Sequence, residues 1–135
     1  MIYVTRREVF SASHKLYNKN LSDEENSRLF GKCCGVYGHG HNYTLEIVVV
    51  GEIDPVTGYV IDLKTLKDII RENVISKMDH KHLNYEVDFM KNINPTSENI
   101  VVKIWKQLAD KIPAGKLYSV KLYETENNYV EYKGE

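Results

Sequence analysis

The stretch from Gly31 to Thr44, with the residues after it, constrains the fold more than any other part of the chain. His39 and His41 stand two positions apart in it. Every second residue after them is aromatic or aliphatic: Tyr43, Leu45, Ile47 and Val49. This alternation predicts that the two histidines open a β-strand, where residues two apart share a face. Both imidazoles can then reach one ion, so we expect a metal site at the start of this strand.

Two glycines flank His39 in the same stretch. Gly38 and Gly40 lack a side chain and leave room where a ligand or metal must approach the backbone closely. Both glycines are therefore consistent with a metal site at the start of the strand.

Length and composition indicate one globular domain spanning residues 1–135. Of the 135 residues, 42% are hydrophobic, and nothing suggests a second domain. The 18 basic and 19 acidic residues are mixed along the chain, so no basic stripe indicates nucleic acid or an anionic membrane as a partner. No apolar run approaches the roughly 20 residues that a membrane-spanning helix needs, and the N-terminus lacks the apolar middle of a signal peptide. A cytoplasmic protein is expected.

The two cysteines, Cys33 and Cys34, are neighbours in the chain. Adjacent cysteines form a disulfide only with backbone strain, so they are expected to be free thiols in a reducing compartment.

The remaining patterns predict an α+β domain. Strands are expected at 2–14, 39–52, 117–125 and 129–133, and helices at about 22–30, 63–77 and 96–108. Three residues have the character of helix N-caps: Ser22, Asp62 and Thr96. The order predicts one four-stranded antiparallel sheet with two helices on one face. Because such a sheet has two open edges and one uncovered face, we expect the sheets of several subunits to join.

Three histidines could form a catalytic zinc site. Such a site typically has three protein ligands and one open position. His14 ends the first strand, and His39 and His41 begin its expected partner. A lone strand histidine is more often structural, but two more on the neighbouring strand change this interpretation. The alternative is a closed structural site built from two thiols and two imidazoles, namely Cys33, Cys34, His39 and His41. Adjacent cysteines fit a tetrahedral site poorly.

Further residues could carry protons or bind a ligand. A thiolate at Cys33 beside a cation would have a lowered pKa and could act as a base. In Asp79-His80 the carboxylate could orient the ring and favour its protonated form. For His80 alone, and for Glu124 near a strand end, a structural or solvated role is the simpler interpretation.

These candidate residues lie in six short motifs. In chain order they are FSASH at 10–14, GKC at 31–33 with HGHNY at 39–43, GEIDP at 51–55, MDHK at 78–81, PTSEN at 95–99 and YET at 123–125. Their order and gaps resemble the 6-pyruvoyl-tetrahydropterin synthase family almost from end to end, and the ending at 130–135 also fits.

The resemblance implies a role for each matching residue. It implies a zinc ion held by His14, His39 and His41. Cys33 would be the catalytic thiol, with Asp79 and His80 completing the proton-transfer set. The residues implied to bind the pterin substrate are Glu124, which would anchor the ring, and Thr96, Ser97 and Glu98, which would line its pocket. The fold implied is the tunnelling fold, in which trimers close a barrel, two trimers stack as a homohexamer, and active sites lie between subunits.

The reaction implied is that of a carbon–oxygen lyase in tetrahydrobiopterin biosynthesis. It converts 7,8-dihydroneopterin triphosphate to 6-pyruvoyl-tetrahydropterin with loss of triphosphate. The redox change is internal, which agrees with the absence of a dinucleotide-binding fingerprint. Two alternatives stay open: a 6-carboxytetrahydropterin synthase of the queuosine pathway, whose cysteine usually stands closer to the histidine pair, and a non-catalytic zinc-stabilised binding module. Cys34 departs from the family, which more often has a polar residue there; only Cys33 has the five-residue gap to His39.

Overall fold

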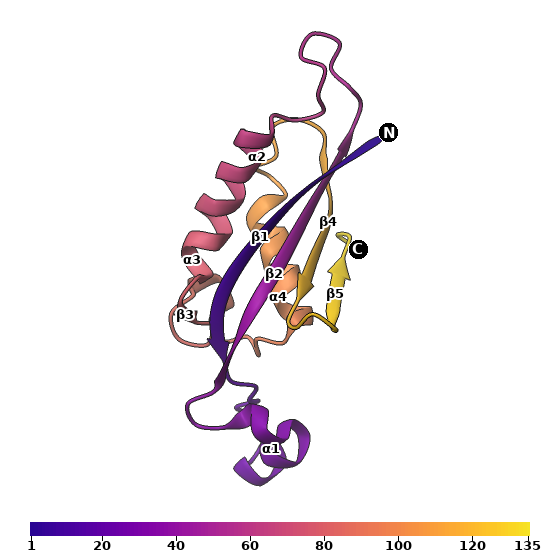
Figure 1. The fold of residues 1–135 in the computed structure, drawn as a ribbon. Helices are drawn as coiled ribbons and strands as arrows, with labels where there is room; N and C mark the ends of the chain where they lie inside the picture. The colour runs from indigo at the N-terminus through magenta and orange to yellow at the C-terminus, as the bar shows by residue number, and fades with distance from the viewer.

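Two long antiparallel strands form the centre of the molecule (Figure 1). The computed structural model describes residues 1–135. Strand β1 (Ile2–His14) pairs with β2 (His39–Gly51) along its whole length, from Ile2 opposite Gly51 to His14 opposite His39. Strand β4 (Lys116–Tyr123) pairs antiparallel with β2, and β5 (Tyr129–Tyr132) pairs antiparallel with β4. These are the four strands that the sequence predicts, to within about two residues at their ends.

The prediction of a purely antiparallel four-stranded sheet is wrong in one respect. A fifth strand, β3 (Lys81–His82), pairs in parallel with β1, so the sheet is mixed and its order is β3-β1-β2-β4-β5. Two residues cannot show the alternation that marks a strand in a sequence. The strand forms because the chain runs along the end of β1, where the N–H groups of His80 and Leu83 donate to the carbonyls of Ser11 and Ser13.

The helices begin where the N-cap residues predict. Ser22, Asp62 and Thr96 accept hydrogen bonds from backbone N–H groups at the starts of α1 (Asp23–Phe30), α2 (Leu63–Ile70) and α4 (Ser97–Leu108). The π-helical turn η2 (Arg71–Ile75) continues α2 into α3 (Ser76–Met78), so one helical run covers the region predicted as 63–77. The short helices η1 (Gly31–Cys34) and η3 (Asp88–Met90) complete the set. None of these helices combines the length and the apolar character that a membrane-spanning helix needs.

The core lies between the sheet and the layer formed by α2, α3 and α4 (Figure 1). It is one cluster of 21 buried residues. The alternating residues of β2 after the histidines, Tyr43 to Val49, are fully buried in it, as their period predicts. No helix covers the opposite face, where Tyr3 and Val9 of β1 are more than half exposed. The strand register places the histidines of β1 and β2 on the helix-facing side.

The segment between β1 and β2 extends beyond the end of the sheet (Figure 1). It contains α1 and η1 and returns to begin β2 at His39. A hydrogen bond from Leu16 N to the carbonyl of Cys33, 2.7 Å long, ties its two halves together. The two cysteines therefore lie at the same end of the molecule as the three histidines.

Candidate metal centre and active site

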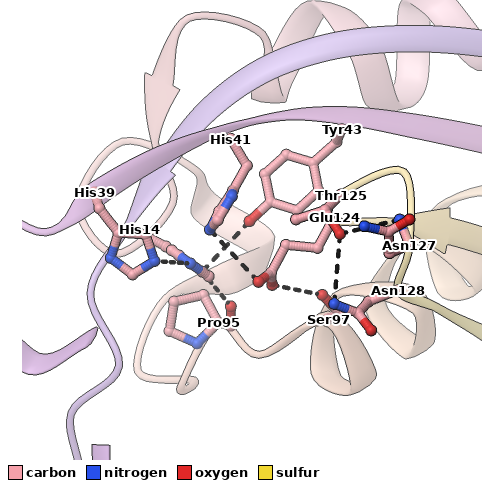
Figure 2. Close-up of polar contacts among 10 residues, drawn as sticks. All are labelled: His14, His39, His41, Tyr43, Pro95, Ser97, Glu124, Thr125, Asn127 and Asn128. Carbon is pink, nitrogen blue, oxygen red and sulfur yellow. Dashed lines mark hydrogen bonds and ion pairs between the residues drawn. The ribbon is translucent and has the colours of Figure 1, made fainter. Parts of the chain in front are cut away.

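Three imidazoles converge at the end of the β1–β2 pair (Figure 2). His14 stands opposite His39 in the ladder, and His41 stands opposite Ala12. All three side chains therefore point to the helix-facing side of the sheet. One ring nitrogen from each lies within 4.8 Å of the others, and the Nε2 atoms of His14 and His39 are 3.2 Å apart.

The orientation of His14 is fixed from the side away from the cluster. Its Nδ1–H donates to the carbonyl of Pro95 at 2.8 Å, and the Tyr43 hydroxyl lies 3.4 Å from the same nitrogen. With the proton on Nδ1, the lone pair of Nε2 faces the other two rings. His14 is only 1% exposed, and this burial lowers its pKa although the Pro95 hydrogen bond opposes the shift. His14 is thus neutral at physiological pH, the state in which an imidazole can bind a metal ion.

His41 carries a nitrogen without a partner. Its Nε2 is buried and forms no hydrogen bond, although Glu124 Oε1 lies 3.5 Å away. Burial lowers the pKa of His41 and the nearby Glu124 carboxylate only partly opposes this, so the ring is neutral. An unpaired buried nitrogen is costly in a protein, and a metal ion would satisfy it.

The donor chemistry fits a metal ion. Three imidazoles with converging nitrogens are a common ligand set that leaves a coordination position open. Neither cysteine belongs to this cluster. The thiol of Cys34 instead donates to the carbonyl of Gly31 at 3.1 Å. The structure therefore supports the three-histidine site and not the site built from two cysteines and two histidines.

Glu124 lies beside the three histidines. It follows β4, and the turn that holds it is closed by hydrogen bonds from Asn127 and Asn128 to the Thr125 hydroxyl (Figure 2). One carboxylate oxygen faces His41, and the other accepts a hydrogen bond from Ser97 Oγ at 2.9 Å. Ser97 begins α4 and is only 8% exposed, so the carboxylate has a fixed position next to the histidines.

The neighbours of Ser97 have other environments. Thr96 is the N-cap of α4, and its hydroxyl accepts a hydrogen bond from Asn99 N. Glu98 is exposed in the first turn of the helix. Of the three residues implied to line a pterin pocket, Ser97 is the one whose side chain forms a hydrogen bond to Glu124.

Asp79 and His80 form a separate pair. Asp79 Oδ1 accepts a hydrogen bond from Ser11 N at 2.9 Å, and Oδ2 lies 3.0 Å from His80 Nδ1. The Ser11 N–H is the main reason why the pKa of Asp79 is below its ordinary value. His80 has a positive φ of 60°, and its side chain is 82% exposed at a cavity of about 360 Å³ that Ser11 and His41 also line. No hydrogen bond connects this pair, or the Cys33 thiol, to the three imidazoles of the same protomer.

Two residues of the site were not singled out from the sequence. Tyr43 follows His41 by two positions in the same strand, so the strand period could have predicted that Tyr43 lies on the same face as the histidines. The carbonyl of Pro95 had no such signal, because only the tertiary fold brings it to His14.

Comparisons with known proteins identify the family. A family model described as 6-pyruvoyl tetrahydropterin synthase matches residues 3–135. The chain belongs to this family. A 6-pyruvoyl tetrahydrobiopterin synthase of Homo sapiens is 52% identical over 98% of this chain and 91% of its own, and one of Pongo abelii is 53% identical over the same shares. The 6-pyruvoyl tetrahydropterin synthase structure from Caenorhabditis elegans superimposes with a TM-score of 0.94 at 38% identity, covering 99% of this chain and 96% of that one. By this membership the chain is an enzyme of the lyase class.

Proposed function

We propose that this enzyme converts 7,8-dihydroneopterin triphosphate to 6-pyruvoyl-tetrahydropterin and triphosphate. The observation that carries the proposal is the cluster of His14, His39 and His41 beside the fixed carboxylate of Glu124. It places a possible metal-binding position next to a carboxylate that could bind the pterin ring. The identity of about half of all positions to the human synthase supports this substrate.

The three imidazoles would hold a zinc ion. Bound there, zinc would supply Lewis acidity to the side-chain oxygens of the substrate and make the adjacent C–H bonds more acidic. The protein contributes the neutral state of His14 and His41 and the fixed orientation of the His14 ring. The Pro95 carbonyl and the Tyr43 hydroxyl contact Nδ1 of His14 and hold its ring, as the outer nitrogen of a metal-binding histidine is usually held.

Glu124 would orient the pterin ring. A carboxylate can accept two N–H donors at once, and the ring presents such donors at one edge. Ser97 holds one oxygen of Glu124. Substrate binding would therefore replace or share this hydrogen bond.

Cys33 would remove a proton from a side-chain carbon, and His80, held by Asp79, would return protons on the other side. The side-chain carbons are oxidised while the ring is reduced, so no external oxidant or reductant is consumed. Within one protomer these groups have no hydrogen bond to the histidine cluster. We therefore propose that the active site is completed between subunits.

The assembly would be a homohexamer of two trimers, each closing its sheets into a barrel. The open edges at β3 and β5 and the uncovered face with its exposed Tyr3 and Val9 support this arrangement. Residues 1–135 would form one catalytic domain. The free thiols of Cys33 and Cys34 support a reducing, cytoplasmic location.

A product assay tests the function directly. Purified protein is supplied with zinc and 7,8-dihydroneopterin triphosphate, and the pterin product is identified by mass. A pyruvoyl side chain is expected. A carboxyl group with release of acetaldehyde would instead assign the chain to the carboxytetrahydropterin reaction.

The Cys33→Ala variant separates catalysis from a purely structural role. It should fold and keep its zinc, because no thiol belongs to the cluster, yet lose turnover. Loss of zinc and unfolding of this variant would point to the non-catalytic binding module.

A further inference from the structure

A polar cavity of about 470 Å³ lies where the chain leaves β1. Two lysines, Lys15 and Lys19, line it together with five asparagines. No carboxylate is among its ten lining residues. Lys15 also lines a neighbouring cavity that contains Asp23, but there the Tyr17 hydroxyl donates a hydrogen bond to Asp23 Oδ1 at 3.1 Å. The cavities beside His80 and Arg7 each contain a glutamate, Glu86 and Glu126. The charge of this cavity therefore suits an anion.

Both lysines are available to a ligand. Neither forms an ion pair within the protein, and Lys15 Nζ lies 4.7 Å from the centre of the Tyr17 ring, a cation–π contact that leaves its N–H donors free. Asparagine amides add further neutral donors. Ammonium groups and amide N–H groups are the usual partners of phosphate oxygens.

The backbone that carries the lysines is fixed. Lys15 N donates to Asn84 Oδ1 at 2.9 Å, and Asn84 Nδ2 donates to the carbonyl of Lys15 at 2.8 Å. Tyr17 N donates to Asn94 Oδ1 at 3.1 Å. Asn94 directly precedes Pro95, whose carbonyl holds His14. The same loop thus positions a wall of the cavity and a metal ligand.

One lysine of the cavity directly follows a histidine of the candidate metal site in the chain. Lys15 stands between His14, a metal ligand, and Leu16, whose N–H donates to the carbonyl of Cys33. The triphosphate of the proposed substrate is attached to the same short side chain as the reacting carbons. Its binding site must therefore adjoin both the metal position and the thiol.

We propose that Lys15 and Lys19 bind the triphosphate of the substrate in this cavity. The inference rests on the proposed function and names the part of the site that receives the anionic end of the substrate. Glu124 and the histidine cluster hold the pterin and its hydroxyls, and the lysine cavity holds the phosphates.

Replacing each lysine by methionine tests this assignment. Lys15→Met and Lys19→Met should each raise the KM for 7,8-dihydroneopterin triphosphate about tenfold, the effect of losing one charge-assisted hydrogen bond. The inhibition constant of 7,8-dihydroneopterin, which carries no phosphate, and the bound zinc should stay unchanged. Lys15→Arg and Lys19→Arg should retain most of the affinity. The control is Lys106→Met, an exposed lysine of α4 without an ion pair.

Three results would overturn this assignment, and they differ in what they say about the proposed function. An unchanged KM in both methionine variants overturns the triphosphate site but leaves the proposed function standing. A parallel rise in the KM and in the inhibition constant of the phosphate-free pterin shows general distortion and also overturns it. A wild-type protein that does not convert the triphosphate substrate overturns the function and this inference together.

Discussion

At the scale of single residues, Gly38 determines how closely the ends of β1 and β2 can approach. Its φ is +71°, and a Cβ at this position would collide with the carbonyl oxygen of His14. Gly40, on the other side of His39, would meet only ordinary contacts. Gly38 is thus required for the close approach of the backbone to His14, whereas Gly40 is not, and the expectation that the two glycines leave room for a metal beside His39 stays a prediction.

Gly38→Ala should weaken zinc binding by about tenfold or more, because the added methyl group must displace His14 or the start of β2 and so disturb a ligand's support. Competition with a zinc chelator measures the affinity. The matched control is Gly58→Ala, which has a φ of +81° but nothing within 4 Å of the added atom. Equal zinc affinities in the two variants would show that the contact with His14 is unimportant.

At the scale of elements, one charged group joins β1 to the helical layer. Glu8 points to the helix-facing side of β1 and is only 8% exposed. It accepts hydrogen bonds from Arg71 of η2 at 2.7 Å and from Arg6 at 3.0 Å. Burial acts to raise the pKa of Glu8, but the hydrogen bonds and charges of Arg71 and Arg6 prevail, so its pKa is lowered. The pair holds η2 in position against the sheet.

Arg71→Met should lower the free energy of unfolding by about 1–2 kcal/mol at pH 7, since it leaves a buried carboxylate with only one arginine. The pKa of Glu8 is lower in the folded than in the unfolded state. Its stabilising contribution is therefore present above the ordinary glutamate pKa of about 4.3 and is lost as the pH falls through the folded value.

Urea unfolding at neutral and at acidic pH should thus show a difference between wild type and Arg71→Met that shrinks on acidification. Lys64→Met serves as the control, since it removes a fully solvated pair with Asp68 and should change stability much less. A difference that is independent of pH would contradict the role of the Glu8 charge.

At the scale of the whole molecule, the proposed proton-transfer residues lie in different parts of one protomer. The histidine cluster faces the helices, while His80 is largely exposed at the β3 edge and Cys33 lies in the segment beyond the sheet. Sheets joined between subunits would bring the His80 of one subunit toward the Cys33 of another. The assembly would then be required for activity as well as for stability.

Mixed assembly tests this requirement. Cys33→Ala and His80→Ala should each be inactive alone, but subunits refolded together should recover roughly a quarter of wild-type activity if each site pairs residues from two randomly chosen neighbours. Mixing the folded proteins without dissociation is the control. If the co-refolded oligomer has no activity, both residues act within one subunit.

The sequence by itself determined the parts of this protein that depend on short-range periodicity. The alternation after His39 and His41 fixed a strand with both rings and Tyr43 on one face, and the N-caps Ser22 and Asp62 fixed helix starts. These features depend on backbone geometry over a few residues, so local residue types are sufficient to predict them. The placement of His14 opposite His39 follows from the pairing of two long strands with complementary apolar faces.

Only the tertiary structure decided the contacts between distant segments. It added β3, brought the Pro95 carbonyl to His14, placed Glu124 beside His41, and left the Asp79–His80 pair without a contact to the cluster. These arrangements depend on how the loops pack after the sheet and helices have formed, and no local pattern encodes that packing. The sequence thus determined the three histidines that could hold a metal, and the packing of the fold determined what surrounds them.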